Sequence, residues 1–341
     1  ALLTGFLWCV ILAVHAIFPF GTKMMDVGDM AEQSVPVYTH LWDVLHGRES
    51  FFFDWNTGLG DNMCGANWHF GLISPFNLFF LFIPRSMVEA SMSFYLLGKL
   101  AAISLSMRFV VKRWFPDLSQ AIRSSLCLLY TFSAFSMGYY YAPMWLDVVF
   151  MFPLVMYTYF RLLARKKECA YSVCLALACM MSFQHTYMLA LMLLLLTGIL
   201  LLLGKERYRD SLWIFCRGTV AAVMLSAWVW LPGILQILAA NRVTHNNSLW
   251  EIYHSVWVFY ADKWVKLLNM GIPLSLFGYY AGRNRKDKGV WFFVYVVGLL
   301  CAPILLESSN LLWHGGSYES FTMRFSYMLA FWVIMAGAYG L

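Results

Sequence analysis

The side chains best suited to chemistry lie in the polar stretch that follows the first apolar block. Asp26, Asp29 and Gln33 stand within the sequence Met-Met-Asp-Val-Gly-Asp-Met-Ala-Glu-Gln. A helix would place Asp29 and Gln33 on one face, and Asp26 and Asp29 could also converge. An acidic pair beside a membrane can act as a general base or hold a divalent cation. The alternative is a helix N-cap with a solvated first turn, because Gly28-Asp29 is a good helix start, and spacing alone favours this alternative.

Other polar side chains stand at the ends of apolar blocks. A carboxylate facing lipid is costly, so Asp147 is expected to face the bundle or a watery cavity, or else to cap a helix. Arg324 can hold a phosphate through two parallel hydrogen bonds, or extend toward lipid headgroups. His185 and His314 could bind phosphate or sugar, although isolated interfacial histidines are more often satisfied locally. The sequence has no His-x-x-x-His spacing of the kind that binds zinc.

Composition places these residues in a membrane protein. Hydrophobic residues make up 61% of the chain and charged residues 12%, whereas soluble domains carry roughly a quarter charged residues. The apolar residues come in blocks long enough to cross about 30 Å of hydrocarbon. We therefore expect residues 1–341 to form one all-α membrane domain, a polytopic bundle of about ten spans. The expected spans are Leu2–Phe18, Met92–Val111, Arg123–Tyr139, Asp147–Leu163, Ala170–Phe183, Tyr187–Leu203, Leu212–Leu238, Lys266–Gly282, Val290–Leu306 and Phe325–Leu341.

Basic clusters give the bundle an orientation. They follow even-numbered spans only, which by the positive-inside rule makes that side cytoplasmic. The clusters are Lys112 and Arg113; Arg161, Arg165, Lys166 and Lys167; Lys205, Arg207 and Arg209; and Arg283, Arg285, Lys286 and Lys288. A crossing by the apolar run Phe70–Ile83 would reverse this pattern, so we expect that run to be re-entrant or interfacial. The outer side then carries a large first loop, Gly21–Ser91. The net charge of +6 belongs to the short basic loops and does not indicate a nucleic-acid partner.

The cysteines and the chain ends carry little information about function. None of the eight cysteines forms a Cys-x-x-Cys pair, so we expect them to be small buried hydrophobes. The chain starts at Ala1 and ends at Leu341 inside an apolar run, and we expect it to be a piece of a longer protein.

A series of short motifs runs along the whole chain. They are Asp29-x-x-x-Gln33, Gly58-Leu59-Gly60, Ser74-Pro75-Phe76-Asn77, Met144-Trp145-Leu146-Asp147 with Phe152-Pro153-Leu154, Leu231-Pro232, Trp313-His314-Gly315 and Arg324-Phe325-Ser326. In this order they resemble the bacterial YfhO family. Ser34 stands in place of the family's usual Tyr, and Gln184-His185-Thr186-Tyr187 in place of its more frequent Asn-aromatic turn.

The resemblance implies a glycosyltransferase of the GT-C class. Such enzymes take a sugar from a polyprenyl-phosphate carrier at the outer face of the bacterial plasma membrane, and an acidic residue of the first outer loop is central. The implied acceptor is teichoic acid or another envelope polymer. In that reaction Asp29 is the candidate base and Asp26 a second carboxylate or metal ligand, so that a divalent cation is a possible cofactor. Arg324 is the candidate phosphate ligand.

Five other residues are candidates for binding the substrate: Gln33, Asn77, Asp147, His185 and His314. The run Phe76–Ile83 could form one wall of a groove for the carrier's chain, or simply pack against neighbouring spans. The competing hypotheses are a transporter or lipid flippase for a lipid-linked or envelope substrate, and a non-catalytic scaffold. Transporters often show inverted repeats and midplane charges, neither of which stands out in the sequence.

Overall fold

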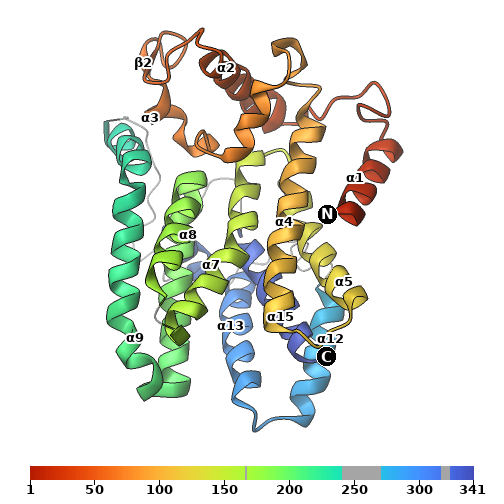
Figure 1. Cartoon of the computed structure of the whole chain (residues 1–341), viewed down its shortest axis with the longest axis vertical. Helices are drawn as coiled ribbons and strands as arrows, with labels where there is room; N and C mark the ends of the chain where they lie inside the picture. Colours follow the sequence, from red (N-terminus) through yellow and green to blue (C-terminus); the bar gives the residue numbers. More distant parts are fainter. Residues whose placement is uncertain (166, 240–269, 316–322) are drawn as a thin grey trace.

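The protein is a helical bundle covered at one end by a folded loop. A computed structural model describes residues 1–165, 167–239, 270–315 and 323–341. Most of the described residues are helical, and the long helices run roughly side by side (Figure 1). The segment between the first helix and the first long one forms the cover at the top of that view.

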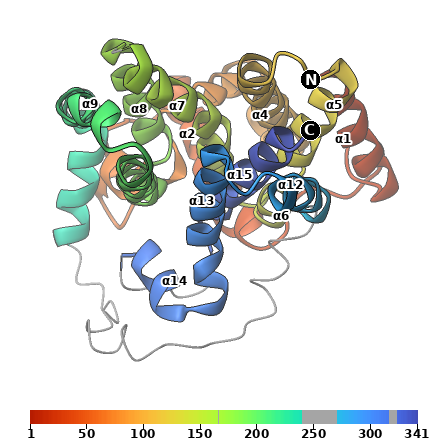
Figure 2. The same ribbon diagram turned by 90° about the horizontal axis from the view of Figure 1, so that it is seen from below.

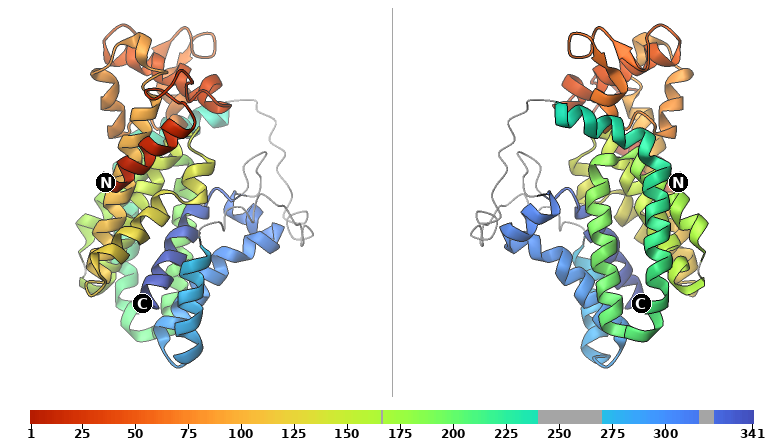
Figure 3. Two further views of the ribbon diagram at one scale, coloured as in Figure 1. Left: turned by 90° about the vertical axis from the view of Figure 1, so that its right-hand side faces the viewer. Right: turned by 90° about the vertical axis from the view of Figure 1, so that its left-hand side faces the viewer.

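Within the described residues, five helical stretches are long and apolar enough to cross a membrane. They are Met92–Trp114, Pro143–Ala164, His185–Gly204, Ser211–Gln236 and Lys288–Leu305. The first two correspond to α4 (Met92–Trp114) and to α7 (Leu146–Arg165) with the short turn before it, and the last to α13 (Lys288–Leu305). The third and fourth are the two limbs of α9 (Phe183–Ala239), which folds back at Gly204, where φ is −151° and ψ is 46°. Figure 3 shows the two limbs lying side by side.

Shorter helices complete the bundle. They are α1 (Leu2–Val14), α5 (Gln120–Thr131), α6 (Ala134–Gly138), α8 (Glu168–Met181), α12 (Gly271–Arg283), α14 (Glu307–Trp313) and α15 (Ser326–Tyr339). Every residue of α15 from Ser326 to Ala338 is buried. A helix that is apolar on all sides belongs in the interior, and Figure 2 shows α15 in the middle, among α4, α5, α12 and α13.

Local chemistry sets several helix starts. Ser119 accepts a hydrogen bond from the backbone N–H of Ile122 at the start of α5, and Asp287 accepts one from Gly289 at the start of α13. Both satisfy an N–H group that the helix itself leaves unpaired. Trp8 then ties α1 to α4, since its indole N–H donates to the carbonyl of Ser93 over 2.9 Å.

Two expected spans end differently in the structure. The helix expected over Arg123–Tyr139 is interrupted. Helix α5 ends at Thr131, and the side chain of Ser133 caps a separate helix, α6. The first helix stops at Val14, and the chain turns at Ala16, which has a positive φ of 53°. Part of the expected span Lys266–Gly282 lies outside the described residues. The count of ten spans therefore stays a prediction.

The cover between α1 and α4 is built from short elements. These are η1 (Met30–Ser34), α2 (Val35–Leu45), β1 (Phe53–Asp54), β2 (Asp61–Asn62), α3 (Met63–Asn67), η2 (Trp68–Phe70), η3 (Pro75–Leu81) and η4 (Arg85–Met87). Strands β1 and β2 pair antiparallel, with Phe53 opposite Asn62. The turn between them contains positive φ values at Gly58, Leu59 and Gly60, which is the conformation that favours glycine.

The run Phe70–Ile83 lies at the boundary between cover and bundle. Its main regular element is η3, a seven-residue 3-10 helix. At about 2 Å per residue it rises roughly 14 Å, less than half of a bilayer core. One edge is apolar and exposed, with Leu78 54% and Phe82 84% accessible. These dimensions agree with an interfacial segment.

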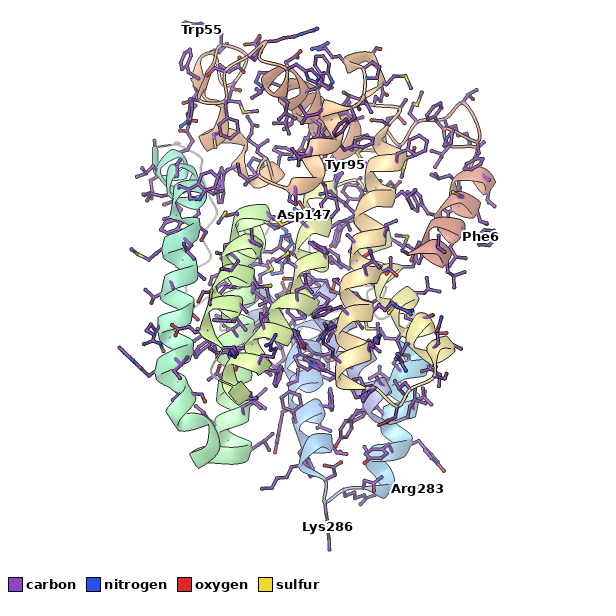
Figure 4. All side chains as sticks on the ribbon, viewed as in Figure 1. Phe6, Trp55, Tyr95, Asp147, Arg283 and Lys286 are labelled. Atoms are coloured by element: carbon purple, nitrogen blue, oxygen red, sulfur yellow. The ribbon has the colours of Figure 1, made fainter. Side chains whose placement is uncertain are left out.

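The two ends of the bundle differ in charge. Figure 4 shows Arg283 and Lys286 at the end opposite the cover, in the turn between α12 and α13. Asp147 and Trp55 lie toward the covered end in the same view. The carboxylates of the cover and the basic α12–α13 turn are thus separated by the length of the apolar helices.

Candidate functional site

A fully buried ion pair lies where the cover meets the bundle. Lys99 of α4 and Asp147 of α7 are both 0% exposed, and Lys99 Nζ lies 2.5 Å from Asp147 Oδ1. The same ammonium donates to the carbonyl of Pro143 over 3.0 Å. Pro143 belongs to η5 (Pro143–Trp145), the short turn that leads into α7. Charged side chains within a membrane span are rare and usually mark functional positions.

The second oxygen of Asp147 faces the cover. A Cβ placed on Gly71 would lie 3.3 Å from Oδ2, and Gly71 has a φ of +66°. The hydroxyl of Ser74 borders the same carboxylate without forming a well-aligned hydrogen bond to it. Asp147 therefore lies in the first turn of α7 rather than at its N-cap, with Oδ1 paired to Lys99 of α4 and Oδ2 beside the Gly71–Ser74 turn.

Asn77 holds the turn in shape. Its amide donates to the carbonyls of Gly71 and Leu72, each over 2.9 Å, and its Oδ1 accepts from the hydroxyl of Tyr95 over 2.7 Å. Each of these three hydrogen bonds joins Asn77 to another group of the protein, and its side chain is buried, with Asn77 only 4% exposed. Asn77 therefore has a structural role in this turn, and its role in binding substrate stays a prediction.

Asp29 and Gln33 share one face, as their spacing predicts. Gln33 Nε2 donates to Asp29 Oδ1 over 2.8 Å at the start of η1. Ser34 ends that element and donates to the carbonyl of Tyr141 over 3.3 Å. Burial and the nearby Asp29 carboxylate raise the pKa of Tyr141. Asp29 thus sits at the edge of the cover, against the loop that precedes α7.

Asp26 is not brought onto the same helical turn. It is exposed and precedes Gly28, whose φ of +55° separates it from the helix that starts at Asp29. Asp26 and Asp29 therefore do not share a helical turn, because the helix begins after Gly28. Among the described residues, no three His, Cys, Asp or Glu side chains are grouped so that they could hold a metal ion.

Arg324 and His314 meet just before α15. His314 Nδ1 lies 2.7 Å from the carbonyl of Asn310, so it donates there, and Nε2 accepts the backbone N–H of Arg324 over 3.3 Å. This pairing is that of a neutral imidazole with its proton on Nδ1. The guanidinium carbon of Arg324 lies 5.5 Å from the centre of the Trp145 ring. Arg324 is therefore packed on an aromatic face at the entrance to α15.

His185 lies beside this group and is completely buried. Its Nδ1 lies 2.9 Å from the hydroxyl of Ser182, while Nε2 has no hydrogen-bond partner among the described residues. The rings of Trp145 and Tyr327 lie 5.6 and 5.8 Å from it. The hydroxyl of Tyr327 is likewise buried without a partner among the residues described. Arg324 and His314 act electrostatically on His185, and the ring of Tyr327 packs against it. We call these four residues, His185, His314, Arg324 and Tyr327, the polar cluster.

Aromatic rings connect the polar cluster to Asp29. Tyr141, beside Asp29, lies 6.2 Å from Tyr139, and Tyr139 lies 5.0 Å from Trp145. Trp145 in turn contacts both His185 and Arg324. The structure therefore gathers three of the predicted site residues and joins them to Asp29 through a row of rings.

Sequence reasoning missed two members of this region, Lys99 and Tyr327. Lys99 carried a signal, because it is the one charged residue in the first half of an otherwise apolar span, Met92–Val111. Tyr327 carried none, since an aromatic residue near a span end is ordinary.

A family comparison gives this arrangement its context. The family model described as bacterial membrane protein YfhO matches residues 1–341, the whole chain. The chain belongs to the YfhO family. No curated protein and no solved structure matches it. As a YfhO-family protein it is a membrane protein, in agreement with its apolar helices. The YfhO motifs around Asp29, Ser74–Asn77, Asp147, His314 and Arg324 all lie in or beside the covered end of the bundle.

Proposed function

We propose that this YfhO-family protein is a glycosyltransferase of the GT-C class. It would move a sugar from a polyprenyl-phosphate carrier to a cell-envelope acceptor such as teichoic acid, on the outer side of the bacterial plasma membrane. One observation carries the proposal. A carboxylate at the edge of the cover, Asp29, is joined by packed rings to the polar cluster, which contains the cation Arg324.

The two halves of this arrangement match the two needs of the reaction. A phosphate is a good leaving group, so the reaction needs no strong general acid. It needs a base for the acceptor hydroxyl and positive charge for the departing phosphate. Asp29 takes the hydroxyl proton as the acceptor oxygen bonds to the anomeric carbon. The bond from that carbon to the phosphate oxygen breaks, and its electron pair leaves with the phosphate toward Arg324.

Neighbouring side chains support these roles. The hydrogen bond from Gln33 orients the Asp29 carboxylate. Nε2 of His185 and the hydroxyl of Tyr327, which have no partner in the described part of the chain, can bind polar atoms of the donor near Arg324. The exposed apolar edge of η3 suits the carrier's hydrocarbon chain at the membrane surface. Asp26 is retained as a second carboxylate, which a divalent cation could recruit.

Transfer in reconstituted membranes tests the proposal. The full-length protein is placed in liposomes with a radiolabelled polyprenyl-phosphate sugar and purified teichoic acid, and wild type is compared with Asp29→Asn. Loss of a general base should lower kcat by roughly 10²–10⁴-fold. The matched control is Asp117→Asn, an exposed carboxylate between α4 and α5. Equal transfer by wild type and Asp29→Asn would exclude Asp29 as the base.

The buried Lys99–Asp147 pair favours a second candidate, a transporter or flippase. Paired charges inside spans are frequent on translocation pathways. The same liposomes distinguish the two functions, because a flippase moves the labelled carrier between leaflets without any acceptor. Flux that persists without transfer would favour translocation, and acceptor-dependent transfer would favour the glycosyltransferase.

A further inference from the structure

The ion pair between Lys99 and Asp147 has a consequence for the cover above it. We infer that Lys99 is a positioning residue. Through Asp147 it holds the turn Gly71–Asn77 against α4 and α7, and through that turn it sets the placement of the helix that begins at Asp29. The effect on sugar transfer rests on the proposed function, whereas the effect on the turn does not.

Burial makes this pair a poor source of stability. Both side chains are 0% exposed, so both ions lose their hydration in the folded state. Removing one partner of such a pair is strongly destabilising, but replacing both by apolar residues of similar volume is often neutral or stabilising. The pair instead contributes specificity, because the two charges favour one arrangement of the groups around them.

The ammonium of Lys99 is surrounded by groups of three different segments. It bonds to Asp147 Oδ1 on α7 and to the carbonyl of Pro143 before it. It also lies 4.9 Å from the ring centre of Tyr95 and 5.2 Å from that of Phe76. Phe76 belongs to the turn itself, so the cation contacts the cover directly as well as through Asp147.

The turn packs closely against α4, α7 and the end of α8. A Cβ on Gly71 would lie 2.9 Å from the carbonyl of Met181 at the end of α8, besides its approach to Asp147. Phe76 packs edge-on against Phe150 of α7. Asn77 closes the turn, and its Oδ1 accepts a hydrogen bond from the hydroxyl of Tyr95. Lys99 and Asp147 lie at the centre of these contacts.

A second set of contacts passes from the turn to Asp29. Tyr38 of α2 donates to the carbonyl of Phe70 over 3.4 Å, next to Gly71, and stacks on Phe80 of η3 at 5.2 Å. Its ring also lies 5.4 Å from that of Tyr95. Helix α2 continues directly from η1, whose N-cap is Asp29. A shift of the turn therefore moves α2 and, with it, the candidate base.

Hydrogen exchange measured by mass spectrometry tests the positioning role in the purified full-length protein. The key variant is the double substitution Lys99→Met with Asp147→Leu, which removes both charges at similar volume. The single variant Lys99→Met leaves Asp147 buried and unpaired. The matched control is Tyr159→Phe, which removes a buried 2.7 Å hydrogen bond between α7 and α9 away from the cover.

We expect the single variant to melt at a lower temperature and the double variant to recover most of that loss. In the double variant, amides of residues 71–81 should still exchange roughly tenfold faster than in wild type, because exchange follows local opening. Tyr159→Phe should leave that segment unchanged. In the transfer assay, the double variant should lose roughly tenfold in kcat with little change in the donor's KM.

Two results would overturn the inference. One is wild-type exchange of residues 71–81 in the double variant, which would make the pair dispensable for the turn. The other is faster exchange with unchanged kcat, which would separate the turn from the candidate base. If wild type itself transfers no sugar, the proposed function fails, and the exchange of residues 71–81 still decides whether Lys99 positions the turn.

Discussion

Gly71 offers a measurement of how tightly the cover is fitted to the bundle. Two separate penalties meet at this position. Its φ of +66° lies in the left-handed region, which costs a non-glycine residue about 1–2 kcal/mol. A methyl group there would also lie 2.9 Å from the Met181 carbonyl and 3.3 Å from Asp147 Oδ2. The first of these neighbours is backbone and cannot rotate away.

The expected cost of Gly71→Ala follows from adding the two penalties. Overpacking in a filled site costs roughly 1–3 kcal/mol, so the total is about 2–5 kcal/mol. Gly47 provides the matched control, because its φ is +69° but nothing lies within 4 Å of its missing Cβ. Gly47→Ala should therefore show the backbone penalty alone, about 1–2 kcal/mol.

Thermal melting in detergent, followed by the monodisperse fraction on size exclusion, compares the two variants directly. Gly71→Ala should lower the melting temperature about twice as much as Gly47→Ala, or more. Equal shifts would mean that the methyl group is accommodated. The close approach of Gly71 to Met181 and Asp147 would then be wrong.

Three further substitutions probe charges and hydrogen bonds near the ends of helices. Arg324→Lys should raise the donor's KM roughly tenfold, because an ammonium cannot hold a phosphate with a planar pair of bonds. The hydrogen bond from Arg85 lowers the pKa of the Asp43 carboxyl. This pair therefore contributes stability above an ordinary carboxyl pKa of about 4 and loses it as the pH falls further. The melting-temperature difference between wild type and Asp43→Asn should accordingly shrink between about pH 6 and about pH 3. Tyr339→Phe removes a 2.7 Å hydrogen bond to Asp287 and should cost about 1 kcal/mol.

Each of these substitutions has a control of the same chemistry. Arg113→Lys, in the last turn of α4 at the end away from the cover, should leave the donor's KM unchanged. An equal rise in KM for this variant would remove Arg324 as the phosphate ligand. Tyr295→Phe changes a tyrosine that is 49% exposed and should leave the melting temperature unchanged. Asp117→Asn, which removes an exposed carboxylate, is measured over the same pH range as the control for Asp43→Asn. A difference for Asp43→Asn that persists at low pH would contradict the ion-pair explanation.

The sequence by itself determined the class of protein and some of its local geometry. Apolar blocks of bilayer length are visible without a structure, because the thickness of hydrocarbon is fixed and a helix rises evenly. The shared face of Asp29 and Gln33 was predicted for a similar reason: residues four apart meet within one helix turn. The expectation that Phe70–Ile83 is re-entrant or interfacial follows from its length and from the charge of the loops, and it stays a prediction.

Predictions based on spacing failed where the local backbone departed from a helix. Asp26 lies three residues before Asp29, but Gly28 with its positive φ separates the two. The span Arg123–Tyr139 is likewise broken because the Ser133 side chain caps a new helix. Both outcomes depend on backbone conformations that a periodic pattern does not encode.

Only the tertiary structure decided which distant residues meet. Lys99 and Asp147 are 48 residues apart and pair because α4 and α7 pack together beneath the cover. The burial of His185 beside Tyr327 depends on α15 occupying the centre of the bundle. Lipid tails are as apolar as the side chains of a span, so no face of the helix is driven by hydropathy toward another helix. Hydropathy therefore predicts that a block crosses the membrane, but it does not predict which helices become neighbours. Their arrangement is set by side-chain packing and by the few buried polar groups, whose partners come from other helices.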